Sequence, residues 1–232
     1  MEARGRIIAQ GRDTDIVDHG PGLVLRRPRV PRSLAAEARV MEWARASGYP
    51  CPAVVEVVDD GMVMERVEGV SMLDDLGRRP WHLRARATLL ADLHGWLHRL
   101  PVPDGLAVEL ARPYGDGAAL LHLDLHPGNV MLGPGGPVVI DWSNAAMGPG
   151  PADVAVAWLL MGAAGVPGGI VDRAVTAVFR PLLVRAFLAE TDRSAAARWL
   201  DPALQRRRAD PHLSAEELDT MARLVARATR RG

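Results

Sequence analysis

The sequence predicts an α+β fold with two lobes, a small β-rich lobe over residues 1–68 and a larger helical lobe over residues 69–232. Three observations predict it. Short β-like runs separated by turns fill the first part, and helical periodicity dominates after Gly69. The 232 residues exceed the most common length of a single domain, so one large domain or two lobes around a cleft is expected. A ligand site is expected in the cleft where the two lobes meet, because such junctions commonly bind ligands.

The small lobe is expected to contain five strands and one helix. The segment His19-Gly20-Pro21-Gly22 is a strong turn signal between two β-like runs. Leu34, Ala38, Met41 and Ala44 recur at intervals of three to four residues, as on one face of a helix. The expected strands are 6–10, 15–18, 23–27, 53–58 and 62–67, and the expected helix is 33–46.

The large lobe is expected to be helical except for one stretch. Pro80 is typical of a first helical turn, and the apolar stripe that follows it ends at Pro101. Residues 120–150 are rich in Gly, Pro, His and Asp and predict short strands and turns. Further helices are expected at 152–161, 171–189 and 215–230.

Composition argues against several classes of protein. Lys+Arg and Asp+Glu both number 28, so the net charge predicts neither nucleic acid nor an anionic membrane as a partner. All 28 basic residues are Arg, so chemistry that usually needs a lysine must use an arginine here. The single cysteine, Cys51, cannot form an internal disulfide and is expected to pack in a turn. No signal peptide or long apolar span is evident, and we expect a cytoplasmic protein.

The candidate catalytic and metal-binding residues lie in the segment 122–129 and shortly after it. Asp124 and Asn129 supply a carboxylate and an amide from one loop, and Asp141 supplies a second carboxylate after the β-like run 138–140. The intervening residues 132–137 contain Gly-Pro-Gly-Gly-Pro, which predicts a hairpin that returns Asp141 to the side of Asn129. Hard oxygen ligands of this kind suit a metal ion bound to phosphates.

These motifs, H-x-D-x-H-P-G-N-V followed by I-D-W, resemble those of the aminoglycoside phosphotransferase and choline kinase family, over roughly residues 7–160. The resemblance implies a protein-kinase-like fold, with ATP and Mg²⁺ as cofactors. It implies that Asp124 orients the acceptor hydroxyl and that Asn129 and Asp141 bind Mg²⁺. It implies that Asp153 braces the catalytic loop from a helix start. His126 is either structural or close to the phosphates.

The small lobe departs from the kinase pattern at one position. In kinases a lysine on the third strand binds the phosphates and pairs with a glutamate on the next helix. Here Arg26 is expected to replace that lysine, with Glu37 as its partner. Arg27 is the alternative if the strand register differs by one residue, since neighbouring residues on a strand point to opposite faces.

Three further nucleotide contacts rest on position along the chain alone. Gly11, in the loop 11–14 between the first two strands, is expected to lie over the phosphates. The resemblance implies that backbone groups near Glu65 and Val67, between the lobes, bind adenine. Backbone contacts leave no residue-type signature in a sequence.

The predicted function is transfer of the γ-phosphate of ATP to a hydroxyl of a small molecule. The alternative is a catalytically weak or inactive kinase-like module that binds nucleotide, which the arginine in place of lysine favours. A nucleic-acid-binding role for the arginines at 206–208 is disfavoured because acidic residues surround them. Residues 191–232 carry nine Arg and six Asp or Glu, a poor trap for a polycationic antibiotic. His94 and His98 are expected to be packing or surface residues, and the sequence does not indicate the oligomeric state.

Overall fold

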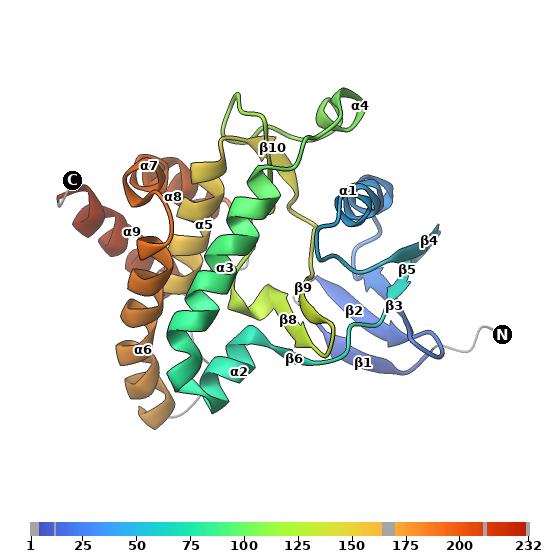
Figure 1. The fold of residues 1–232 in the computed structure, drawn as a ribbon, viewed down its shortest axis with the longest axis horizontal. Helices are drawn as coiled ribbons and strands as arrows, with labels where there is room; N and C mark the ends of the chain where they lie inside the picture. The colour runs from blue at the N-terminus through green and yellow to red at the C-terminus, as the bar shows by residue number, and fades with distance from the viewer. Residues whose placement is uncertain (1–4, 12, 164–169, 211–212, 231–232) are drawn as a thin grey trace.

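The structure is a computed structural model that describes residues 5–11, 13–163, 170–210 and 213–230, with the backbone alone for 170–178. A β-rich part, drawn in blue, lies at one end of the molecule and a helical part, from green to red, lies at the other (Figure 1). Short strands and loops from the middle of the sequence lie between them. This arrangement confirms the predicted α+β fold.

The β-rich part is an antiparallel sheet of five strands in the order β1-β2-β3-β5-β4, together with helix α1. Neighbouring residues on β3 face opposite sides, so Val24 joins the main hydrophobic core while Leu25 packs with Val17 and Val63 on the other face. The elements are β1 (Ile7–Gln10), β2 (Thr14–Asp18), β3 (Leu23–Pro28), α1 (Ala35–Ala46), β4 (Val54–Val58) and β5 (Gly61–Glu65).

The C-terminal end of α1 is anchored to the helical part. Tyr49 follows α1 and is buried, and its ring makes edge contacts with Trp96 and Trp142, at 5.4 and 5.6 Å between centroids. Its hydroxyl donates a hydrogen bond of 3.2 Å to the carbonyl of Leu93. Aromatic pairs of this geometry add to the energy of simple burial. Tyr49 therefore joins the β-rich part firmly to the helices.

The chain leaves the five-stranded sheet at Glu65 and enters the helical part at Val70. Gly69, between them, has a φ of +135°, and a Cβ there would collide with the carbonyl of Leu132. Only glycine fits this close passage of two backbones. The domain boundary at 68/69 stays a prediction, although it coincides with this connection.

Helix α5 forms the centre of the helical part. It is buried along most of its length, and α3, α6, α8 and α9 pack around it. Helix α3 contributes the predicted apolar stripe through Leu90, Leu93 and Leu97. The helices are α2 (Met72–Arg78), η1 (Pro80–His82), α3 (Leu83–His98), α4 (Asp104–Ala107), η2 (Pro127–Asn129), α5 (Gly150–Ala163), α6 (Ile170–Ala189), α7 (Arg193–Ala197), α8 (Leu200–Arg208) and α9 (Ala215–Thr229).

Two small antiparallel sheets lie where the β-rich and helical parts meet. One has the order β6-β8-β9 and the other pairs β10 with β7. Strands β8 and β9 form the predicted hairpin, with Val130 opposite Val139. The strands are β6 (Val70–Ser71), β7 (Ala119–Leu121), β8 (Val130–Gly133), β9 (Gly136–Val139) and β10 (Ala146–Gly148).

The elements expected from sequence are confirmed to within a few residues, but α2, α4, α7, α8 and β6 were not predicted. Among the described residues, no helix combines the length and apolar character needed to span a bilayer.

Candidate active site

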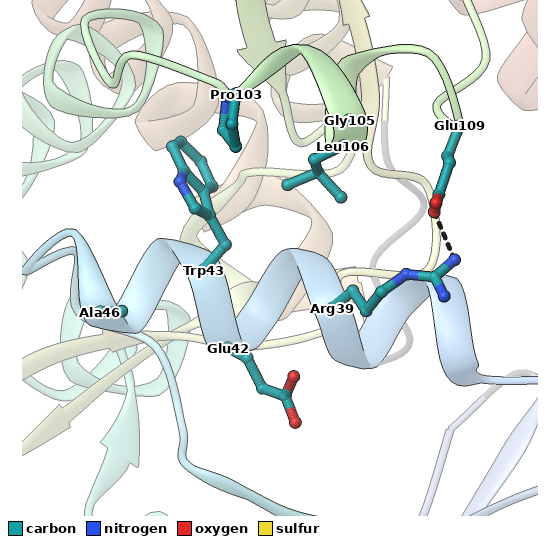
Figure 2. Close-up of a pocket in the computed structure, with 8 residues that line it drawn as sticks. All are labelled: Arg39, Glu42, Trp43, Ala46, Pro103, Gly105, Leu106 and Glu109. Carbon is teal, nitrogen blue, oxygen red and sulfur yellow. Dashed lines mark hydrogen bonds and ion pairs between the residues drawn. The ribbon is translucent and has the colours of Figure 1, made fainter.

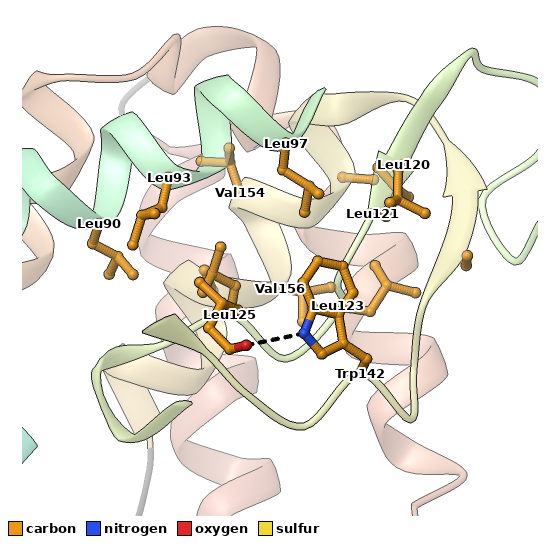
Figure 3. Packing of buried hydrophobic residues seen from close by; sticks show 14 of the residues in the cluster. Leu90, Leu93, Leu97, Leu120, Leu121, Leu123, Leu125, Trp142, Val154 and Val156 are labelled. Atoms are coloured by element: carbon orange, nitrogen blue, oxygen red, sulfur yellow. Dashed lines mark hydrogen bonds between the residues drawn. The ribbon is translucent and has the colours of Figure 1, made fainter. Parts of the chain in front are cut away.

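The loop between β7 and η2 presents Asp124 on a rigid base. Leu123 and Leu125 on either side of it are buried, and Figure 3 shows both side chains in the apolar cluster with Trp142. The side chain of Asp124 between them is 20% exposed, so its carboxylate lies outside that core. Leu123 has a φ of +59°, an uncommon conformation for a non-glycine residue. Such strain persists where the surroundings hold the backbone.

Asp153 on α5 holds this strained backbone. Its carboxylate accepts hydrogen bonds from the backbone N–H of His122 at 3.1 Å and of Leu123 at 2.7 Å. His98 on α3 lies 3.0 Å from the same carboxylate through Nε2. These contacts supply the brace that the family resemblance implied for Asp153.

The surroundings of Asp153 keep it ionised although it is buried. Burial works to raise its pKa, but the neighbouring His94 and His98 outweigh that and hold the pKa well below the ordinary value of 3.8. Nδ1 of His94 lies 3.5 Å from the carboxylate, too far for a strong hydrogen bond, and its Nε2 is 3.2 Å from the carbonyl of Leu125. The two rings thus have more than the packing or surface roles expected from sequence. Their three-residue cluster has metal-ligand chemistry, but the hydrogen bonds account for it as a brace.

Asn129 is locked to Asp124. Its Nδ2 donates 2.9 Å hydrogen bonds to the backbone carbonyl and to Oδ2 of Asp124. The β8–β9 hairpin then returns the chain, and the N–H of Ile140 donates to the carbonyl of Asn129 at 3.0 Å. Asp141 is the next residue and has a φ of +62°. The predicted approach of Asp141 to Asn129 is therefore confirmed.

Arg26 joins the β-rich part to this loop. Its Nη1 contacts both carboxylate oxygens of Glu37 on α1, at 2.7 and 2.8 Å, and its Nη2 donates to Oδ1 of Asp141 at 2.9 Å. The predicted Arg26–Glu37 pair is confirmed, and the Arg27 alternative is not needed. Burial raises the pKa of Glu37, the positive charge of Arg26 opposes that rise, and Asp141 adds to it.

The oxygens of Asn129 and Asp141 suit a hard divalent cation. Both donor contacts of Nδ2 of Asn129 go to Asp124, so Oδ1 is the remaining polar atom of that side chain. The Asp141 side chain is 40% exposed, and its Oδ1 accepts from Arg26 and from Ser143. An amide and a carboxylate oxygen leave room for waters and phosphate oxygens, as Mg²⁺ prefers.

Arg207 on α8 is a site residue that sequence reasoning missed. Its Nη2 lies 3.3 Å from Oδ1 of Asp124 and 3.3 Å from the carbonyl of Leu123. Nε2 of His126 lies 3.9 Å from the same Oδ1, while Nδ1 of His126 accepts from the N–H of Gly128 at 3.0 Å. Two basic side chains therefore face one oxygen of the carboxylate.

The remaining predicted nucleotide contacts lie in the β-rich part. The N–H of Gly11 donates to the carbonyl of Thr14 at 2.8 Å, so that donor is used within the turn, and Arg12 of the same loop lies outside the described residues. The N–H of Glu65 donates to Ala53, and its carboxylate accepts from the N–H of Ala53 and pairs with Arg45 at 3.2 Å. Val67 is half-buried in the connection between β5 and β6.

Two aromatic rings support the loop from below. The His122 ring is fully buried, 4.9 Å between centroids from Trp142, and burial lowers its pKa. Neither of its ring nitrogens has a hydrogen-bond partner within the described part of the chain. Nε1 of Trp142 donates to the carbonyl of Val139 at 3.0 Å. These rings therefore pack under the site.

A groove of about 420 Å³ lies elsewhere, between α1 and the segment around α4. Figure 2 shows Trp43 and Leu106 facing into it, and an ion pair of Arg39 with Glu109 crossing one end. None of the residues that line it is one of the residues described above as contacting Asp124. It is therefore separate from the expected ligand cleft.

The bilobal fold, the braced carboxylate loop and the buried Arg–Glu pair define a protein with a kinase-like fold. The model of the phosphotransferase enzyme family matches residues 6–117 and 106–193. The chain belongs to this phosphotransferase family.

Solved structures of other proteins have a similar fold. The streptomycin–ATP–APH(2")-IIa ternary complex is 13% identical with a TM-score of 0.64, covering 96% of this chain and 90% of that one. ADP-bound aminoglycoside phosphotransferase APH(2'')-Ib is 14% identical with a TM-score of 0.62, covering 96% and 92%. A Plasmodium vivax ethanolamine kinase is 10% identical with a TM-score of 0.58, covering 95% and 81%. A search of the curated proteins finds no match.

Proposed function

We propose that this phosphotransferase moves the γ-phosphate of ATP to a hydroxyl of a small molecule, with Mg²⁺ as the metal. The observation that carries the proposal is the convergence of Asp124, Asn129 and Asp141 around one hairpin, with Arg26 reaching Asp141 from the other part of the fold. Similar structures contain ATP or ADP, which supports the choice of nucleotide.

Each group has a distinct task in this proposal. Oδ2 of Asp124 is held by Asn129, so Oδ1 is the oxygen that orients the acceptor hydroxyl and takes its proton. Asn129 and Asp141 would hold Mg²⁺, which supplies charge neutralisation of the phosphates when bound. Arg26, fixed by Glu37, would bind phosphate oxygens with its planar fork of donors. The main chain from Glu65 to Val67 and the turn at Gly11 would border the nucleotide.

This division of tasks assigns nucleotide binding mainly to residues 1–68. Residues 69–232 would supply the catalytic loop, the metal ligands and the acceptor site. Because Nη2 of Arg26 already contacts Asp141, that contact must loosen or be shared when metal and phosphates bind.

A second candidate is a kinase-like module that binds nucleotide without efficient transfer. The same Arg26–Asp141 contact of 2.9 Å favours it, because an arginine held on the metal-binding carboxylate competes with the metal. Turnover separates the two candidates, whereas nucleotide binding does not.

The test combines nucleotide binding with an Asp124→Asn variant. Mg-ATP is expected to raise the melting temperature of both proteins, because the metal ligands and Arg26 are retained. Transfer to a panel of hydroxylated metabolites is expected to fall by roughly 10²- to 10⁴-fold in the variant, since the acceptor proton loses its base. Equal turnover by variant and parent would remove the role assigned to Asp124, and no shift with millimolar Mg-ATP would contradict both candidates.

A further inference from the structure

Arg207 lies at the oxygen of Asp124 that an acceptor must reach. Helix α8 ends in three consecutive arginines, and the side chains of Arg206 and Arg208 are exposed. The Arg207 side chain is only 14% exposed and is directed at the catalytic loop. An arginine that only served the electrostatics of a helix end would not need to be turned inward.

The contacts of Arg207 are loose compared with those of Arg26. Its distances to Asp124, to the carbonyl of Leu123 and to Asp210 are 3.3, 3.3 and 3.4 Å. The Arg26–Glu37 pair, at 2.7 and 2.8 Å, has the short distances of strong charged hydrogen bonds. Arg207 thus approaches Asp124 without forming a forked pair, although its guanidinium offers five donors.

An acceptor hydroxyl bound to Oδ1 of Asp124 must come close to Arg207. Oδ2 is committed to Asn129, and Oδ1 is flanked by Arg207 at 3.3 Å and by His126 at 3.9 Å. A positively charged acceptor would meet the fixed charge of a guanidinium at the point of reaction. A carboxylate or phosphate next to the hydroxyl would instead match its planar fork of donors.

We propose that Arg207 is a substrate-binding residue and that the acceptor carries an oxyanion, a carboxylate or a phosphate, close to the hydroxyl that is phosphorylated. The proposal rests on the proposed function and names its substrate class. Arg207 moves from Asp124 to the oxyanion when the acceptor binds, which frees Oδ1 to take the proton of the hydroxyl. The net positive charge of residues 191–232 also favours an anionic acceptor.

The experiment compares acceptors in matched pairs. Glycerate is paired with glycerol, ribose 5-phosphate with ribose, and ethanolamine and streptomycin serve as cations. ADP formation with Mg-ATP is measured for each acceptor, and binding of each acceptor to the protein loaded with Mg-AMP-PNP is measured by calorimetry. The two anionic members separate a carboxylate from a phosphate as the recognised group.

The variants are Arg207→Ala, Arg207→Lys and, as the matched control, Arg208→Ala on the same helix. Anionic members are expected to exceed their neutral partners by more than about 10-fold in the parent and in the control. The alanine variant is expected to raise KM for them roughly 10- to 100-fold by losing charged hydrogen bonds, with the lysine variant in between. An unchanged melting shift with Mg-ATP shows that each variant is folded and binds nucleotide.

Three results would overturn the proposal. One is preference for neutral or cationic acceptors, and another is failure of both anionic members to bind or react. The third is an equal loss for every acceptor in Arg207→Ala, which would place the guanidinium on the transferred phosphoryl group. The proposed function is tested separately: the Mg-ATP shift of the parent reports nucleotide binding without any acceptor, and ADP formation with an acceptor of any charge reports transfer.

Discussion

Replacing Arg26 by alanine tests the connection between the β-rich part and the catalytic loop. The substitution leaves Glu37, a residue only 8% exposed, without its two short contacts and frees Asp141 from its 2.9 Å contact. Removing one partner of a buried ion pair costs about 3–5 kcal/mol. Arg32 lies 4.0 Å from Glu37 and can replace part of the lost interaction. We therefore expect the free energy of unfolding to fall by about 3 kcal/mol.

The loss of stability in Arg26→Ala is expected to depend on pH. Burial already raises the pKa of Glu37 above its ordinary value of 4.5, and without Arg26 it rises further. The folded variant then binds more protons than the unfolded chain above pH 4.5, so its stability falls as pH rises from there through the folded pKa. The difference from the parent is therefore smaller at about pH 5 than at about pH 8.

Urea unfolding at both pH values, with a thermal melt, measures these differences. A loss of about 3 kcal/mol corresponds to roughly 6–12 °C in melting temperature for a chain of this size. The matched control is Arg27→Ala, on the opposite face of the same strand, where a change within about 0.5 kcal/mol is expected. If both variants unfold at the same urea concentration, or if Arg26→Ala keeps the full melting shift with Mg-ATP, the assigned role of this pair is wrong.

Two further predictions concern buried groups. Asp153→Asn removes the charge and turns an amide N–H₂ toward a backbone N–H, so we expect the free energy of unfolding in urea to fall by about 2 kcal/mol. We also expect a lower kcat, with KM for ATP unchanged. A kcat equal to that of the parent would show that the contacts of Asp153 do not matter for catalysis. Cys51 is 1% exposed and burial raises its pKa, so a thiol reagent at about pH 8 should label it slowly in the native protein and at once in denaturant. Rapid native labelling would contradict its buried position.

The site around Asp124 could be predicted because its parts are close in sequence. Asn129 follows Asp124 by five residues, and a single hairpin returns Asp141 to them, so local turn chemistry brings these residues together. The Arg26–Glu37 pair could be predicted for a different reason. The strand and the helix that carry these residues both have clear periodicity, and the family resemblance supplied the pairing.

Arg207 could not be predicted in this way. It is 83 residues from Asp124, and the two meet only because α8 packs against α5. No local pattern encodes such a contact. Helix α2 is different, since the Ser71-x-x-Asp74 spacing is a capping signal and the side chain of Ser71 does accept from the N–H of Asp74 at 3.0 Å. The position of His98 also indicated a role beside His94, since the two histidines lie one helical turn apart on the buried side of α3.

The aromatic contacts of Tyr49 fix the C-terminal end of α1, so a tilt of the helix moves its N-terminal end most. Tyr49 is held by Trp96, Trp142 and the carbonyl of Leu93, whereas Glu37 lies near the opposite end of the helix. The nine residue-to-residue steps of helix from Glu37 to Ala46 span about 14 Å, so a tilt of roughly 10° about the anchored end displaces Glu37 by about 2 Å. That displacement exceeds the tolerance of a hydrogen bond. A rotation of that size about the anchored end would therefore be enough to break the Arg26–Glu37 pair.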